Sequence, residues 1–322
     1  MVRRGAAGFA ALALLAILLG LPGCGGGGDS GSRRGANLPD AGGGGTLSYA
    51  LPRLPTSLDP LAAQGRPALI VVRQVYEPLI EQLTGPYGDN AQAPGLALTV
   101  RPSKDRTTWT LTLRQGVRFQ DGTPFNAAAV LANARRWQSD SWGKKLLPHL
   151  FAVDAPRPDE VRFLLNAPVR DFPARLADPR LGIVSPQALD PETGIKAQFR
   201  EQSGGAGTGA FQPATAAATG RVELSRFSGW WGSPVGLGPS FDGVAFLLTA
   251  SAAERLELLQ GATVEVAEPL GPEQLAAAED DPLLVTVGGP ASGIGMEGSV
   301  RGIDSARAVP VLSGVWLTRI TG

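Results

Sequence analysis

The sequence predicts an α/β protein built around a mixed β-sheet. Several short segments alternate apolar and polar residues with a period of two, which is typical of half-buried strands. Other segments carry apolar residues three and four positions apart, which is typical of amphipathic helices. Hydrophobic residues make up 43% of the 322 residues and charged residues 18%, so the chain can bury a substantial core. Because β–β hairpins and β–α–β units follow one another, parallel and antiparallel strands are expected in one sheet.

The folded part is expected to begin with a strand over residues 46–51, where Leu47, Tyr49 and Leu51 alternate with smaller side chains. Prolines then interrupt regular structure. Residues 69–83 show mainly helical spacing, although Pro78 should kink or end that helix.

Residues 107–125 carry the clearest strand signal, because Trp and Leu alternate with Thr and a Gln-Gly turn follows. A second alternating run, Val117 and Phe119, precedes an Asp-Gly turn. Asn126 is then positioned to cap a helix over residues 127–138, whose apolar side chains fall on one face.

The rest of the chain continues the alternation of strands and helices. Helices are expected in a short segment from Phe172, in 251–262 between the cap Ser251 and the stop Gly261, and in 271–281. Strands are expected within 159–169, 181–184, 220–232, 241–249, 263–270 and 282–289.

The N-terminus has the layout of a secretory signal. Arg3 and Arg4 precede an uncharged Ala/Leu-rich run that ends at Leu21, and the chain's only cysteine, Cys24, follows. This arrangement resembles a bacterial lipobox, in which cleavage before the cysteine leaves the thiol to carry a diacylglycerol. The alternative is an uncleaved membrane helix with an incidental cysteine, although the run is short for a bilayer span. We predict a signal peptide at residues 1–23 and lipidation of Cys24.

Three further segments are expected after the signal peptide. Residues 24–45 are rich in Gly and Ser and should form a flexible tether. Residues 46–289 are expected to form the folded lobe, and residues 290–322 a short C-terminal segment that could return to it. Two acyl chains would be enough for stable anchoring of such a chain to a membrane.

Composition and missing motifs exclude several kinds of chemistry. Lys plus Arg equals Asp plus Glu, which argues against a nucleic-acid partner. His149 is the only histidine, so it would have to be the base of any Ser-His-Asp triad, and nothing in the sequence around it suggests that role. A zinc or nickel site would lack protein ligands, because one histidine and one cysteine cannot supply three or four. Residues 205–210 fit a G-x-G-x-x-A pattern, but no buried strand precedes them and no good helix follows. We therefore expect no cofactor, no metal and no catalysis.

Six stretches occur in an order that identifies a family. The chain resembles the family 5 extracellular solute-binding proteins, the peptide- and nickel-binding group that serves ABC importers. The stretches are SLDP (57–60), VYEPLIE (75–81), LRQGVRFQDGTPFNAAAVLANARRW (113–137), GAGTGAFQP (205–213), LSRFSGWWG (224–232) and FDGVAFLLTASAAERLELLQGATVEVAE (241–268).

The resemblance implies an α/β, periplasmic-binding-protein-like (type II) lobe with a mixed sheet. Members of the family normally continue into a second lobe that closes over the ligand. Only residues 290–322 remain here, so the second lobe is expected to be largely missing, although residues 315–320 could add a strand. Alanines at 127–129 replace the family's acidic residues, and Phe211 replaces a tyrosine.

The function that the resemblance implies is that of a lipid-anchored substrate-binding component of an ABC importer, outside the cytoplasm. Its partners would be a peptide or other small solute, ABC permease subunits and the membrane. The candidate ligand-binding residues are Tyr49, Leu51, Arg53, Tyr76 and Trp316, and for each the alternative is a core or surface position. A non-transport interaction module of the cell envelope is the alternative function, and an enzyme is a third option.

Overall fold

The computed structural model describes residues 44–84, 90–190, 194–196, 206–214, 220–235, 239, 241–287 and 297–301. All of them fall within one compact unit, Asn37–Gly322. Its largest sheet has seven strands, and β1 (Thr46–Leu51) runs parallel to both of its neighbours while the other pairs are antiparallel. The predicted mixed sheet is therefore confirmed. The strand order is β10 (Phe211–Pro213), β11 (Arg221–Arg226), β12 (Gly243–Leu248), β1, β13 (Val266–Leu270), β15 (Glu297–Arg301) and β14 (Leu284–Val287).

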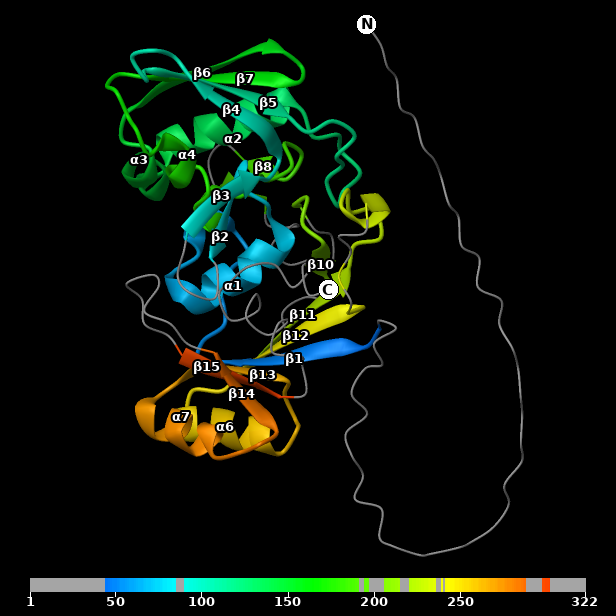
Figure 1. Cartoon of the computed structure of the whole chain (residues 1–322). Coiled ribbons are helices and arrows are strands. Elements are labelled where there is room, and N and C mark those ends of the chain that lie inside the picture. The colour runs from blue at the N-terminus through cyan, green and yellow to red at the C-terminus, as the bar shows by residue number, and fades with distance from the viewer. Residues whose placement is uncertain are drawn as a thin grey trace, which may run out of the picture. The chain divides into compact units, whose positions relative to one another are not determined.

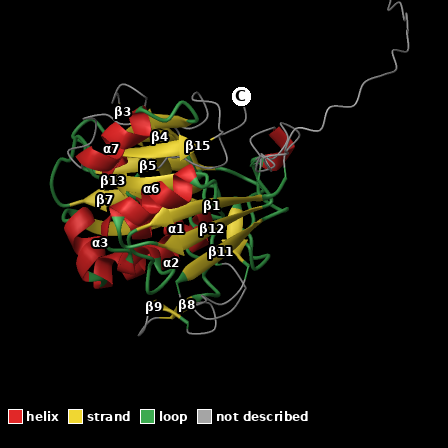
Figure 2. Cartoon of the chain, turned by 90° about the horizontal axis from the view of Figure 1, so that it is seen from below, coloured by secondary structure: helices red, strands yellow, loops and turns green. Residues whose placement is uncertain are grey.

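Helices cover both faces of this sheet (Figure 1). Leu47, Tyr49 and Leu51 point to the face covered by α1 (Gly65–Val75), as their period of two requires. Ala50 points to the opposite face, where α6 (Ala252–Gln260) and α7 (Pro272–Glu279) pack. Figure 2 shows the sheet from the side of α6 and α7. The central strand is thus buried on both faces, as expected for a strand with two parallel neighbours.

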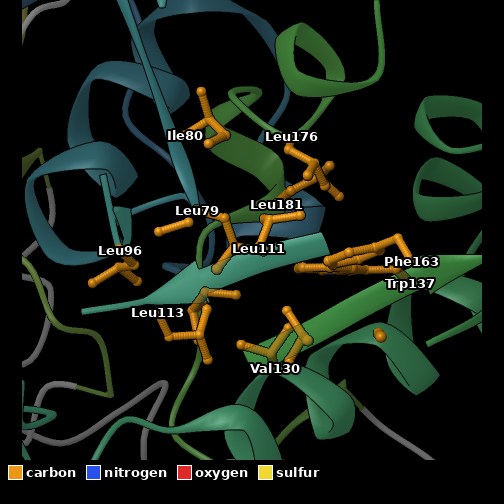
Figure 3. Close-up of a cluster of buried hydrophobic side chains, with 14 of the residues drawn as sticks. Leu79, Ile80, Leu96, Leu111, Leu113, Val130, Trp137, Phe163, Leu176 and Leu181 are labelled. Carbon is orange, nitrogen blue, oxygen red and sulfur yellow. The ribbon is translucent and has the colours of Figure 1, made fainter. Parts of the chain in front are cut away.

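A second, antiparallel sheet carries its own core. Its strand order is β4 (Ala97–Pro102), β5 (Thr108–Leu113), β7 (Glu160–Leu165) and β6 (Leu150–Arg157), and α2 (Ala127–Ser139), α3 (Ser141–Leu146) and α4 (Phe172–Arg175) lie with it. Figure 3 shows side chains of β5, β7 and α2 converging, among them Leu111, Phe163 and Trp137. The rings of Phe163 and Phe172 lie 5.4 Å apart between centroids.

Short elements complete the described part of the chain. The strands β2 (Ile80–Thr84) and β3 (Asn90–Pro94) form one hairpin, and β8 (Leu189–Asp190) pairs with β9 (Gly194–Ile195). Single 3-10 turns occur at Pro60–Ala62, Pro179–Leu181 and Ser233–Val235.

Both predicted helix caps are confirmed. The Asn126 side chain accepts a hydrogen bond from Ala129 N at 3.2 Å at the start of α2. Ser251 Oγ accepts from Glu254 N at 3.4 Å at the start of α6, and Gly261 ends that helix.

The helix predicted within 69–83 ends at Val75, just before Pro78, so the prediction that this proline would kink or end it is confirmed. Residues 80–84 form strand β2. Two local predictions were wrong. Residues 117–119 form no strand, since their only pairing is the isolated bridge Arg118↔Pro124. Residues 181–184 are buried but not a strand, because the backbone N–H of Val184 donates to the Asn133 side chain instead.

Candidate functional site

The parallel strands β1, β12 and β13 end at the same edge of the large sheet. Their last residues are Leu51, Leu248 and Leu270, and Leu51 pairs directly with Leu248. In open α/β sheets, ligands bind beyond the carboxyl ends of the strands. We call the residues that follow these three strands the carboxyl edge. A binding site is expected there.

A cavity of about 380 Å³ opens at the carboxyl edge. Its size falls within the range of about 300–1,000 Å³ that is typical of small-molecule sites. Three segments distant in sequence form it: the loop after β1, the start of β11 and the end of β12. The antiparallel pairing of β11 and β12 places Arg221 opposite Leu247, next to the rim. The lining residues are Arg53, Leu54, Pro55, Gly220, Arg221, Val222 and Leu248.

The cavity combines two guanidinium groups with an apolar wall. Arg53 is exposed. Arg221 Nε lies 2.6 Å from Glu223 Oε1, with both side chains more than 40% exposed. Leu248 is 49% exposed and supplies the accessible apolar part of the lining. Such a surface can hold a small molecule that has an anionic group and an apolar part.

A buried polar cluster lies behind the same edge. Arg66 Nη2, in the first turn of α1, lies 3.0 Å from Glu268 Oε2 on β13. Burial raises the pKa of Glu268, and the charge of Arg66 partly offsets this. Burial, together with the negative charge of Glu268, raises the pKa of the Tyr49 hydroxyl well above its ordinary value. The ion pair connects α1 to β13, which fixes the helix over the sheet.

Arg255 holds two of the strand ends together. Its Nη1 donates to the carbonyl oxygens of Thr249 at 2.6 Å and Ala250 at 3.0 Å, directly after β12. Its Nε and Nη2 donate to the Pro269 carbonyl in β13 at 3.0 and 2.6 Å. This buried cation therefore satisfies backbone carbonyls at the carboxyl edge, and these bonds make the edge rigid.

The candidate residues from sequence lie in different environments. Arg53 lines the cavity. Tyr49 and Leu51 are fully buried against α1, and the Tyr49 ring packs on Phe246 at 5.5 Å between centroids. Tyr76 is also buried, at the end of α1, and burial raises the pKa of its hydroxyl. Cys24 and Trp316 lie outside the described residues. The ligand-binding role of the five candidates and the lipidation of Cys24 remain predictions.

Arg221 and Leu248 were not predicted as site residues from the sequence. Their signals were weak: an arginine beside a glycine turn, and a leucine at the end of an apolar run. They became site candidates only because β12 pairs with β1 on one side and with β11 on the other. That pairing is non-local and could not be deduced from spacing.

The motifs that suggested the family meet at a buried carboxyl group, Glu77. Trp231 Nε1 donates to Glu77 Oε2 at 2.9 Å, and Trp230 Nε1 donates to Oε1 at 3.1 Å. Arg114 lies over the Trp231 ring at 3.9 Å from its centroid. Burial raises the pKa of Glu77 to about 8, against the opposing effect of the Thr208 hydroxyl and the tryptophan N–H donors. The indole N–H groups of the two tryptophans therefore supply hydrogen bonds to a buried carboxyl group. This contact fits a structural role in the core rather than stacking against a ligand.

Glycines and a glutamine complete this junction. A Cβ on Gly207 would lie 1.9 Å from the Val75 carbonyl oxygen, and one on Gly209 would lie 2.4 Å from the Gln74 carbonyl oxygen. Both positions therefore need glycine, because a side chain would collide with the backbone of α1. Gln120 Nε2 donates to the carbonyl oxygens of Gly209 and Phe211 at 3.1 and 2.8 Å. These motifs position the two sheets and do not face the cavity.

Other kinds of site find no support in the described part of the chain. His149 is exposed, and its Nδ1 lies 3.0 Å from Asn166 Oδ1. No group of three His, Cys, Asp or Glu side chains suited to a metal ion occurs among the residues that the structure describes. Within the same residues, no helix has the length and apolar character needed to span a bilayer.

The architecture is that of periplasmic binding proteins. The peptide-bound ABC transporter-associated periplasmic binding protein DppA from Helicobacter pylori aligns with a TM-score of 0.66 and 20% identity, over 76% of this chain and 51% of that one. An ABC transporter substrate-binding protein from Sinorhizobium meliloti aligns with a TM-score of 0.62 and 25% identity, over 75% of this chain and 48% of that one.

Sequence comparison identifies the family. The model of the bacterial extracellular solute-binding proteins, family 5 Middle, matches residues 91–297. The chain belongs to this family. The glutathione-binding protein GsiB of Salmonella typhi is 32% identical over 238 residues, which are 73% of this chain and 44% of GsiB. The chain thus spans less than half the length of this relative. The resemblance predicted from the motifs is confirmed, and these relatives are named as binding proteins rather than enzymes.

Proposed function

We propose that this chain is the lipid-anchored substrate-binding component of an ABC importer, and that it holds a peptide or similar small solute without changing its covalent bonds. The observation that carries the proposal is the cavity at the carboxyl edge in a member of family 5. One similar protein is named for binding glutathione and another was solved with a peptide, which supports a solute of the size of a short peptide.

The proposed mechanism is reversible binding followed by delivery. The loop after β1, the start of β11 and the end of β12 provide the floor of the site, and Arg255 and the Arg66–Glu268 pair hold the neighbouring strand ends in place. A rigid floor reduces the entropy lost on binding. Residues 46–289 would form the binding lobe, with Tyr49, Leu51, Tyr76 and Trp316 as further candidates around the solute, and ABC permease subunits would receive it.

The proposed anchor is a diacylglycerol on Cys24, joined to the lobe by the Gly/Ser-rich residues 24–45. It would place the protein outside the cytoplasm, on the surface of a membrane. Cys24→Ser should abolish incorporation of labelled fatty acid and leave the unprocessed precursor. Equal labelling of the variant and the parent would refute the anchor without affecting the binding proposal.

Binding is tested on the purified full chain with pools of short peptides. A bound peptide present at 100 times its dissociation constant should stabilise the fold by about 2.7 kcal/mol, which raises the melting temperature by a few degrees. Equilibrium dialysis with mass spectrometry would identify the retained peptides. Unchanged melting with no retained solute, or the appearance of new products in the pool, would overturn the proposed function.

A further inference from the structure

We propose that Arg53 and Arg221 select solutes with a carboxylate group, and that Leu248 receives an apolar substituent next to it. This inference rests on the proposed function and specifies the class of solute. It predicts short peptides with a free C-terminal carboxylate, or small organic acids of similar shape.

The charge of the cavity supports an anionic ligand. Its seven lining residues include two arginines and no acid. Arg221 is partly neutralised by Glu223, but that pair is exposed to solvent and therefore weak. Arg53 has no ion pair among the described residues. A guanidinium without a carboxylate partner presents the geometry that binds a carboxylate through two parallel hydrogen bonds.

Other arginines of the chain have structural roles, because they are buried or nearly buried and are held by acidic side chains or backbone carbonyls. Arg73 Nη2 lies 2.7 Å from Glu81 Oε2, and both side chains are buried. Arg136 pairs with Asp59, and Arg255 is enclosed by backbone carbonyls. Arg53 differs from them because it is exposed, and it borders a cavity rather than a neighbouring acid.

The residues on both sides of Arg53 have restricted backbones. Pro52 precedes it, and Leu54-Pro55 follows. Each proline fixes its own φ angle and restricts the residue before it. The Thr249 N–H also donates to the Leu51 carbonyl at 2.8 Å, which attaches the start of this loop to the end of β12. Little backbone ordering is therefore needed when Arg53 binds a ligand.

The apolar wall adds selectivity for the group next to the carboxylate. Leu248 is 49% exposed at the end of β12, whereas Val222 on the neighbouring strand is only 5% exposed and belongs to the core beneath the cavity. An apolar side chain placed there would cover the exposed leucine and gain the free energy of burying both surfaces. The cavity thus has a cationic part and an apolar part next to each other.

The experiment compares one equimolar tripeptide pool as free acids and as C-terminal amides, with equilibrium dialysis against the full chain. Acids should be retained at least about tenfold more strongly than the matching amides, because a charge-assisted pair is lost in the amide. Peptides with an apolar last residue should be enriched. Arg53→Gln should bring acids down to the level of amides, and Arg221→Gln should weaken acids less.

Arg101→Gln is the matched control, since Arg101 is an exposed arginine on β4 that does not line the cavity. It should leave retention of the acids unchanged. Equal retention of acids and amides, or an Arg53→Gln variant that binds like the parent, would overturn the inference while the proposed function stands. Retention of neither pool would overturn both. Competition by inorganic phosphate or sulfate as strong as that of the acid peptides would show an anion site without carboxylate selectivity, and would also overturn it.

Discussion

Glu77 should make the stability of the protein depend on pH in a definite direction. Its pKa is raised from an ordinary 4.5 to about 8 because the carboxyl group is buried. Between these values the unfolded chain releases the proton and the folded chain keeps it. The free energy of unfolding should therefore fall as pH rises through this window, and stop falling above about pH 8.

The size of the effect follows from the shift. One pKa unit corresponds to about 1.4 kcal/mol, so the whole window is worth on the order of 5 kcal/mol. Glu77→Gln cannot titrate but keeps an oxygen that can accept from the indole N–H of Trp230 or Trp231. The difference in unfolding free energy between parent and variant should consequently shift in favour of the variant as pH rises from about 5 to 8.

Urea denaturation at several pH values, followed by tryptophan fluorescence, measures this difference. Taking parent minus variant removes the contributions of the other titrating groups. Glu257→Gln, which removes an exposed acid from α6, controls for the loss of a surface charge. If the parent and Glu77→Gln curves run parallel across the window, the burial argument for Glu77 is wrong.

Three further changes test the packing by urea denaturation. Gly207→Ala should cost at least about 3 kcal/mol, because the added Cβ would lie 1.9 Å from the Val75 carbonyl oxygen, and a normal midpoint would contradict this contact. Asn133→Leu should cost about 2–4 kcal/mol, since the amide bonds both backbone groups of Val184 at 2.7 and 3.0 Å and they would be left buried without partners. Phe163→Ala should cost about 3–5 kcal/mol, whereas Phe151→Ala, at a side chain 72% exposed, should cost under about 0.5 kcal/mol. Equal losses for the two phenylalanines would show that the core is assigned wrongly.

Local patterns predicted local structure well. The alternation in residues 46–51 correctly assigned Leu47, Tyr49 and Leu51 to one face of β1, and Asn126 correctly marked the start of α2. These features depend on side chains within a few residues of one another. They can therefore be deduced from spacing and capping chemistry alone.

Errors arose where a distant partner decides the structure. Residues 181–184 carry an apolar run, but Asn133 supplies the hydrogen bonds that a neighbouring strand would have made. The strand β15 was not expected, because its residues Glu297–Arg301 have little apolar character and their position depends on β13 and β14. The cavity belongs to this class too, since Arg53 and Arg221 meet only through the pairing of β1, β12 and β11.

The place of β1 in the sheet has a consequence for how the chain reaches its native state. The backbone N–H of Gly45 bonds to the Asp242 side chain, 197 positions further on, and both hydrogen-bonding edges of β1 are taken by strands from the later part of the chain. The first strand to leave the ribosome must therefore wait for the last third of the lobe before it finds a partner. Contacts of such long range make assembly slow, so the large sheet can be completed only after β12 and β13 have been synthesised.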